Sequence, residues 1–218
     1  PVSTIVNLLE RSARTGNCQS LGLRMAEHRQ LSDFGEVSLL LSYQPNLREA
    51  LQVTSFVAVM GNLGPTIVRF EEPGLPVTVN VRVGSVMSLL WSATGRAFFA
   101  FMDDDARVDA LLARELAEAP AARRALLDGA DPLGTLRREI RAAGCASVRD
   151  VNLPGISAVA APLHDYTGHV VGVLCALGAS GGFDPDPQGA VARALRAEAA
   201  RVSASLGHLP GEARLKPG

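Results

Sequence analysis

One segment of the chain combines small residues with a helix start in a way that could bind an anion. Residues 89–102, LLWSATGRAFFAFM, are predicted to be a strand end followed by a helix, with Ser92 as the N-cap. The backbone N–H groups of Ala93, Thr94 and Gly95 would then point out of the helix N-terminus, where they have no partner within the helix. Small side chains let a ligand approach these groups and the helix dipole favours negative charge, so the segment predicts a site for an anion such as a carboxylate. An ordinary capped helix explains the same residues equally well.

The other reactive side chains do not form a recognisable catalytic or metal-binding pattern. His164 and His169 flank one turn, but no cysteine or further histidine stands at ligand spacing, so a solvated pair is the better interpretation. The acidic run 103–105 lies where it would complement the dipole of the next helix. Cys175 lies in the apolar run VVGVLCAL, which offers no activating group, and Cys145 is the better candidate for a reactive thiol. Phosphate-loop and nucleophile-elbow motifs are missing from the sequence. We therefore predict no catalytic residue, metal ion or cofactor.

Composition narrows the classes of partner. The 218 residues include 21 basic and 22 acidic side chains, a net charge of −1, so no global positive field draws the chain onto nucleic acid or an anionic membrane. Arg137, Arg138 and Arg141 form a basic stripe, but Glu139 interrupts it, which favours a solvated helix face. No apolar run approaches the ~20 residues of a membrane span. Three cysteines without a CxxC spacing are typical of reduced thiols, so we expect a cytoplasmic protein without a membrane partner.

The hydrophobic period changes along the chain and predicts an α+β fold. Helical spacing and β-branched runs bounded by Gly and Pro predict helices at 3–14, 20–44, 46–52, 92–102, 106–116, 133–143 and 188–206, and strands at 55–61, 65–71, 76–83, 156–163 and 169–177. Because the helices are grouped between runs of strands, an antiparallel sheet flanked by helices is favoured over βαβ repeats. The 169–177 run is apolar on both faces, which is typical of a central strand. The last two strands would form a hairpin, and this hairpin would form the floor of a cavity next to Ser92.

Two segments resemble the effector-binding domain of IclR-type transcriptional regulators. SATGRAFFAFM (92–102) is similar to the family's Gly-(Lys/Arg)-Ala-x-x-Ala helix start. IRAAGCASVRDVNLPGISAVAAPLHDYTGHVVGVLCALG (140–178) contains, in the family's order, Ile-Arg-x-x-Gly, Pro-Gly-Ile, Ala-Ala-Pro and a closing Gly. SLGLRMAE (20–27) is similar to the Leu-Gly-x-Arg that opens the family's linker helix. The resemblance covers about residues 20–206 and implies a GAF-like antiparallel sheet flanked by helices, preceded by a linker helix, with an effector cavity and assembly into homodimers or homotetramers.

The N-terminal residues resemble part of the family's winged helix-turn-helix. PVSTIVNLLERSA (1–13) is similar to its Pro-x-Ser-Thr recognition-helix start, and RTGNCQSLGLR (14–24) to the wing and exit. The domains implied are a remnant of the DNA-binding domain at 1–19, a linker helix at 20–44, a GAF-like effector-binding domain at 45–207 and a flexible tail at 208–218. When the N-terminal domain is complete, the residues implied to contact promoter DNA are Ser3, Thr4, Asn7, Arg11 and Arg14.

The resemblance also implies where an effector would bind. Carried over by motif, the effector positions and their neighbours at the cap are Pro76, Val79, Trp91, Ser92, Ala93, Thr94, Gly95, Val148, Ala158, Cys175 and Leu177. Most are apolar, whereas relatives that bind small keto acids have polar residues at several of them. We therefore expect a hydrophobic or aromatic effector with a carboxylate at the helix start, in a ligand-responsive bacterial transcriptional regulator that is not an enzyme. Two alternatives stay open. One is a stand-alone GAF-like sensor or assembly module without DNA binding, and the other is an enzyme such as a cysteine-dependent sulfoxide reductase, which needs an exposed, low-pKa thiol.

Overall fold

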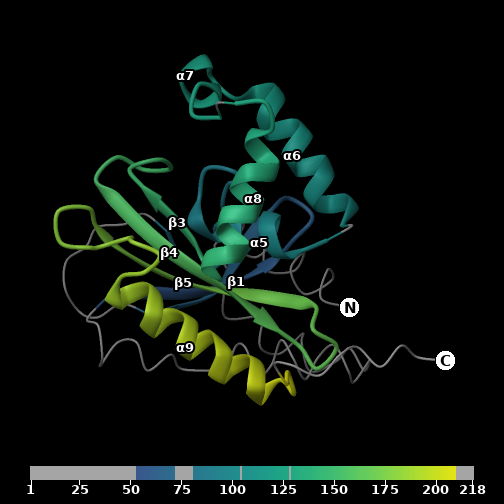
Figure 1. Cartoon of the computed structure of the whole chain (residues 1–218), viewed down its shortest axis with the longest axis vertical. Helices are drawn as coiled ribbons and strands as arrows, with labels where there is room; N and C mark the ends of the chain where they lie inside the picture. The colour runs from purple at the N-terminus through teal and green to yellow at the C-terminus, as the bar shows by residue number, and fades with distance from the viewer. Residues whose placement is uncertain (1–52, 72–80, 104, 128, 210–218) are drawn as a thin grey trace.

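A five-stranded antiparallel sheet forms the centre of the molecule, with helices on both faces (Figure 1). The structure, a computed structural model, describes residues 53–71, 81–103, 105–127 and 129–209. The strands, in chain order, are β1 (Thr54–Met60), β2 (Pro65–Glu71), β3 (Ala146–Arg149), β4 (Ile156–His164) and β5 (Val170–Ala179). Their order across the sheet is β2-β1-β5-β4-β3, and every neighbouring pair is antiparallel. β5 therefore occupies the centre, which confirms the expectation from its continuous apolar run.

The helices divide between the two faces of the sheet. One face carries α5 (Ala93–Phe101) and α8 (Pro132–Ala143), with α6 (Ala106–Glu118) and the short α7 (Ala121–Arg124) beyond them. The opposite face carries α9 (Ala190–Ser205), which packs on β4 and β5. No helix in the described ranges is long and apolar enough to span a bilayer.

Alternating residues of β1, β2, β4 and β5 belong to two separate hydrophobic cores, one on each face of the sheet. On β1, Phe56 and Ala58 point to the α5 side, whereas Val57 and Val59 point to the α9 side, and all four are at most 1% exposed. Successive side chains of a strand face opposite ways, so a strand covered on both sides must be apolar throughout. The continuous apolar sequence of β5 follows from the same arrangement.

The predicted elements of the described ranges are mostly confirmed. The helices at 92–102, 106–116, 133–143 and 188–206 and the strands at 55–61, 65–71, 156–163 and 169–177 correspond to α5, α6, α8, α9, β1, β2, β4 and β5, with ends shifted by a few residues. The expected strand 76–83 is wrong over its described part, 81–83, because these residues form a loop and a turn. α7 and β3 were not predicted, since both have only four residues. The helices expected before residue 53 lie outside the described residues.

Candidate functional site

The start of α5 is built by a hydrogen-bonded turn rather than by the expected strand end. Residues 89–91 are in turns, and Ser92 has the extended backbone of an N-cap, with its Oγ accepting a hydrogen bond from the Gly95 N–H at 2.9 Å. The predicted cap is therefore present. Since the Gly95 N–H is already bonded, the donors left at this helix end are the N–H groups of Ala93 and Thr94, for which the described residues provide no acceptor.

Gly95 supports the turn and does not face a ligand, which corrects its assignment to the effector site. A Cβ at this position would lie 2.1 Å from the Ser88 carbonyl oxygen and 2.4 Å from the Leu89 Cα. Both contacts are with backbone, so only glycine lets the turn pass this close to the helix. The glycine in this motif is required for packing.

A carboxylate from α6 holds the same turn. Glu115 accepts hydrogen bonds from the Ser88 hydroxyl at 2.7 Å and from the N–H groups of Leu89 and Leu90 at 2.6 and 3.0 Å. Arg96, one turn into α5, donates from Nε to the Leu90 carbonyl oxygen at 2.8 Å, and its burial lowers the pKa of its guanidinium from the ordinary value. The helix start is therefore fixed from two sides before any ligand arrives. The sequence analysis missed Glu115, since nothing in the spacing links it to a turn about 25 residues away.

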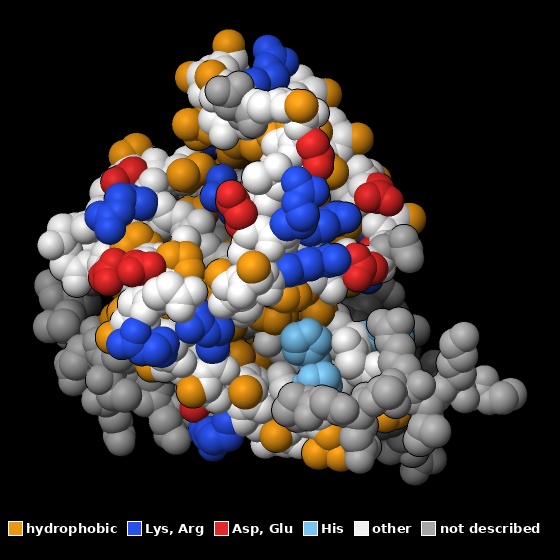
Figure 2. Space-filling model, in the orientation of Figure 1, with side chains coloured by type: hydrophobic (Ala, Val, Ile, Leu, Met, Phe, Trp, Pro, Cys, Tyr) orange, Lys and Arg blue, Asp and Glu red, His pale blue; other side chains and the backbone are white. Residues whose placement is uncertain are grey.

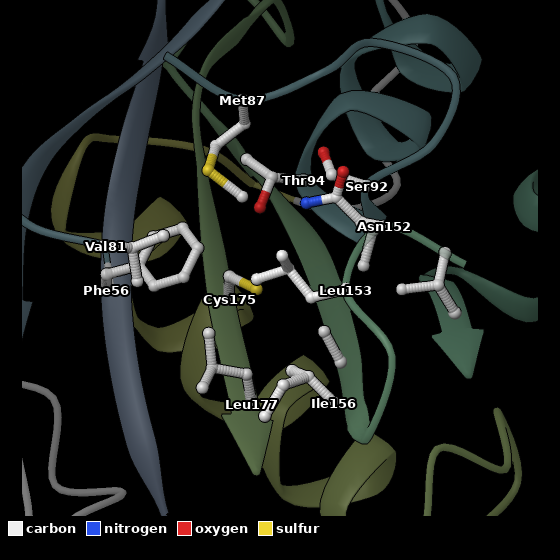
Figure 3. Close-up of a pocket in the computed structure, with 13 residues that line it drawn as sticks. Phe56, Val81, Met87, Ser92, Thr94, Asn152, Leu153, Ile156, Cys175 and Leu177 are labelled. Atoms are coloured by element: carbon white, nitrogen blue, oxygen red, sulfur yellow. The ribbon is translucent and has the colours of Figure 1, made fainter. Parts of the chain in front are cut away.

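Beside this helix start lies a small, mostly apolar cavity between α5 and the sheet (Figure 3). Its volume is about 30 Å³, enough for one or two water molecules. It is lined by Phe56, Val81, Met87, Ser92, Ala93, Thr94, Val148, Asn152, Leu153, Ile156, Ala158, Cys175 and Leu177. The structure thus brings together seven of the predicted effector residues: Ser92, Ala93, Thr94, Val148, Ala158, Cys175 and Leu177. Pro76 and Val79 lie outside the described residues.

The polar groups of the cavity are few, and one of them has no strong protein partner. The Thr94 side chain points into the cavity (Figure 3), and the residue is only 1% exposed. Its Oγ1 makes no hydrogen bond of normal geometry with the described part of the chain, and the Cys175 thiol beside it is a weak partner. A buried hydroxyl without a strong partner costs free energy, so a bound molecule or water that supplies an acceptor would stabilise it. No lining residue carries a formal charge. The Thr94 hydroxyl and the two free N–H groups of the helix end are therefore the groups available to a polar ligand.

A short loop between β3 and β4 closes one side of the cavity. Asp150 begins this loop with a φ of 58°, and its Oδ1 accepts hydrogen bonds from the Gly155 N–H and the Ser180 hydroxyl, both at 2.7 Å. The loop carries Asn152 and Leu153 to the cavity. Leu153 is 41% exposed, so it can move without breaking a packed core.

Trp91 lies elsewhere, which corrects its placement beside the effector. Its side chain is 3% exposed and packs with Leu90 and Ala119, with the Arg123 guanidinium carbon 5.7 Å from the ring centroid. It lines a second groove, on the α6 side of the turn. The residue before the cap points away from the cavity because the turn reverses the chain there.

The described cysteines are not suited to nucleophilic or redox chemistry. Burial raises the pKa of the Cys175 thiol to about 12, and the neighbouring Thr94 hydroxyl offsets this only in part. Cys145 is 1% exposed, and its Sγ lies 3.2 Å from Nη1 of Arg196. Both thiols are buried, so neither is the exposed thiol that the enzyme alternative requires.

The other histidine and charged residues predicted from the sequence make ring contacts, helix caps and ion pairs. His164 stacks on His208 with ring centroids 4.9 Å apart, and no group of three or more potential metal ligands occurs within the described ranges. Asp105 caps α6 by accepting from the Arg107 N–H at 2.9 Å, as expected for the acidic run. Basic and acidic side chains mix along α8 (Figure 2), and Arg138 and Arg141 pair with Asp131 and Asp103. Arg138 and Arg141 are thus exposed as expected, whereas Arg137 is not, because its guanidinium packs over the Phe99 ring at 4.5 Å and its Nε is buried.

The sheet, its helices and the small cavity define an α+β domain, and comparison with known proteins identifies its family. Residues 47–204 match the C-terminal domain of bacterial IclR transcriptional regulators. HmgR from Pseudomonas aeruginosa is 33% identical, with a TM-score of 0.69, over 88% of this chain and 72% of that one. IclR from Thermotoga maritima is 20% identical, with a TM-score of 0.66, over 87% of this chain and 72% of that one. An IclR-type regulator from a Silicibacter species is 22% identical, with a TM-score of 0.65, over 87% of this chain and 73% of that one.

The chain belongs to the IclR family of transcriptional regulators, which are not enzymes. The family match covers most of the chain, and the 33% sequence identity to HmgR extends over 88% of it. A comparison with curated protein sequences gives no match. The resemblance to the family's effector-binding domain and the predicted α+β class are thereby confirmed.

Proposed function

We propose that this regulator binds a small hydrophobic or aromatic carboxylate in the cavity at the start of α5, and that binding alters its affinity for promoter DNA. The observation that supports this most directly is the unpartnered Thr94 hydroxyl, buried beside two free N–H groups in an otherwise apolar cavity. A carboxylate would accept hydrogen bonds from all three groups and would interact favourably with the helix dipole. The apolar lining would receive the rest of the molecule.

Ligand entry must displace side chains. A cavity of about 30 Å³ is far smaller than the ~300 Å³ or more of sites that hold drug-sized ligands. The exposed Leu153 and the unbranched Met87 are the side chains best placed to move. Occupancy of the site would therefore change the packing of the β3–β4 loop and of the turn before α5. A ligand that prefers one arrangement shifts the population toward it, which is what regulation requires.

The test is ligand binding by the full chain, with a variant that removes only the Thr94 hydroxyl. Calorimetry and thermal shift with phenylacetate and related aromatic carboxylates should show binding, and the neutral amide of each acid should bind more weakly. Thr94→Val should weaken binding about tenfold to a hundredfold, the loss expected for a hydrogen bond to a charged group. Thr135→Val, at an exposed position of α8, is the matched control. Failure of every carboxylate to bind, or equal affinity in Thr94→Val, would contradict the proposal.

The regulatory step needs a separate measurement on DNA. We propose that the chain acts in the cytoplasm as a homodimer or homotetramer, and that Ser3, Thr4, Asn7, Arg11 and Arg14 contact the promoter when the DNA-binding domain is complete. Fluorescence anisotropy with DNA from upstream of its own gene, with and without the carboxylate, measures the coupling. Phosphate contacts predict that affinity falls steeply with salt. Ligand binding without any DNA binding by the full-length protein would instead support a stand-alone sensor.

A further inference from the structure

The turn before α5 has a second side, and that side faces an open groove between the turn, α6 and α7. The groove has a volume of about 340 Å³ and is lined by Leu63, Val86, Trp91, Arg114, Glu118 and Arg123 among others. We call it the Trp91 groove. Met87 and Ser88 also line it, and Met87 lines the cavity described above, so one stretch of chain separates the two spaces. The Trp91 groove is within the size range of small-molecule sites, which is ~300–1,000 Å³.

Apolar side chains form part of the Trp91 groove and are not fully covered. Val86 is 42% exposed and Leu63 is 37% exposed, which makes them two of the few large hydrophobic residues at the surface of the described chain. Trp91 is buried in the wall, where Arg123 covers its ring. An apolar ligand lying there would remove Val86 and Leu63 from water.

The two arginines of the groove have no carboxylate partner within the described residues. Arg123 contacts the Trp91 ring and belongs to no ion pair. Arg114 donates from Nη2 to the Leu63 carbonyl oxygen at 3.3 Å and is likewise unpaired. A guanidinium has five donors in a planar fork, so most of the donors on both side chains remain available to a planar anion.

The groove has as many carboxylates as guanidinium groups, but one of the carboxylates is already held by the turn. Glu115 lines the groove, but its two oxygens already accept one hydroxyl and two backbone N–H groups of the turn. Glu118 is then the single carboxylate without such bonds, against two guanidinium groups. We infer that the Trp91 groove is a second ligand site, separate from the effector cavity, that binds an amphipathic organic anion with its apolar part on Val86 and Leu63 and its charge on Arg123 and Arg114.

The probe for this site is 8-anilinonaphthalene-1-sulfonate, a fluorescent aromatic anion that exceeds the volume of the effector cavity. The chain has a single tryptophan, so energy transfer from Trp91 reports probe bound to this domain, and the arginine variants assign it to the groove. N-phenyl-1-naphthylamine, the same molecule without its sulfonate, measures how much of the binding is due to the apolar part alone. The titrations use the full chain.

The arginine variants provide the decisive comparison. Arg123→Ala should weaken the sulfonate about tenfold or more, the loss expected for a charged hydrogen-bonding partner. Arg124→Ala, on the next residue of the same short helix, should leave affinity unchanged because Arg124 is not among the groove residues. Glu118→Gln should tighten binding by removing the opposing charge. Neither Arg123→Ala nor Arg124→Ala should change carboxylate binding in the effector cavity, and Thr94→Val should not change sulfonate binding.

Three results would overturn the inference: equal sulfonate affinity in Arg123→Ala and the parent chain, equal affinity for the charged and neutral probes, or equal weakening by Arg124→Ala. Far-ultraviolet circular dichroism of each variant confirms that it is folded before titration. Because the groove and the cavity are tested with different probes and variants, failure of one proposal does not decide the other.

Discussion

Replacing Gly95 by alanine should lower the free energy of unfolding, because the added Cβ would clash with the turn before α5. The added Cβ would lie 2.1 Å from the Ser88 oxygen and 2.4 Å from the Leu89 Cα. Overpacking of this kind costs ~1–3 kcal/mol, and contact with backbone on both atoms places this case at the upper end, about 3 kcal/mol. Alanine regains about 1 kcal/mol through its higher helix propensity, so the net loss of unfolding free energy is about 2 kcal/mol.

A second glycine in the chain provides an internal control. Gly134 occupies the same position in α8 that Gly95 occupies in α5, three residues after the N-cap, which is Asp131 there. A Cβ on Gly134 would lie 2.0 Å from Asp131 Oδ2. That contact is with the end of a flexible, 61% exposed side chain, which can rotate away. Gly134→Ala should therefore change the unfolding free energy by less than about 1 kcal/mol.

Urea unfolding followed by circular dichroism measures both variants. For a chain of this length, a loss of about 2 kcal/mol corresponds to a fall in Tm of roughly 4–8 °C. Gly95→Ala could prove as stable as the parent chain, or the two glycine variants could lose the same stability. In either case the close approach of turn and helix would not be the reason that position 95 requires glycine.

The other predictions test the groups around the same site. Glu115→Gln should lower the unfolding free energy by about 2 kcal/mol, since an amide cannot accept from all three donors, and Glu118→Gln, without such bonds, should not. Cys175 has a pKa of about 12 in the folded chain, above its ordinary value of 9.0, so the folded state holds its proton longer. Stability should therefore fall by about 1.4 kcal/mol per pH unit as pH rises from about 9 toward 12, and Cys175→Ala should remove this contribution in urea titrations at each pH. Burial and the neighbouring His208 lower the pKa of His164, so the unfolded chain takes up this proton first and stability falls as pH drops below ~6.5. His164→Gln should reduce the difference in unfolding free energy between pH 7 and pH 5.

Most of the fold could be predicted from local patterns. β-branched runs between Gly and Pro residues marked four of the five strands, and the uniform apolar sequence of β5 placed it at the centre of the sheet. β3 was missed because its four residues, Ala146–Arg149, are ordered by pairing with β4 rather than by their own periodicity. α7 is equally short, and a four-residue helix has too few turns to show a hydrophobic face.

Only part of the candidate site could be predicted from the sequence. The N-cap at Ser92 could be predicted because it depends on residues three positions apart. The floor of the cavity, with Ala158 on β4 and Cys175 on β5, followed from the family resemblance and the hairpin, whose register pairs Ala158 with Leu177. Glu115 could not be predicted, since a hydrogen bond from α6 to the turn depends on how two distant elements pack. For the same reason the sequence could not show that Trp91 points to the opposite side of the turn.

Consecutive residues at the start of α5 have different roles: some face the cavity, and the next one supports the turn. The first two helical residues, Ala93 and Thr94, keep free N–H groups and face the cavity, whereas the third, Gly95, faces the turn and has its N–H bonded to the cap. Substitutions one residue apart should therefore separate two effects. Thr94→Val removes an unpartnered buried hydroxyl, so the free chain should be at least as stable as its parent while ligand affinity falls. Gly95→Ala should instead lower stability even when no ligand is added. Loss of stability in Thr94→Val would mean that the hydroxyl has a partner within the protein, and the argument that it awaits a ligand would then fail.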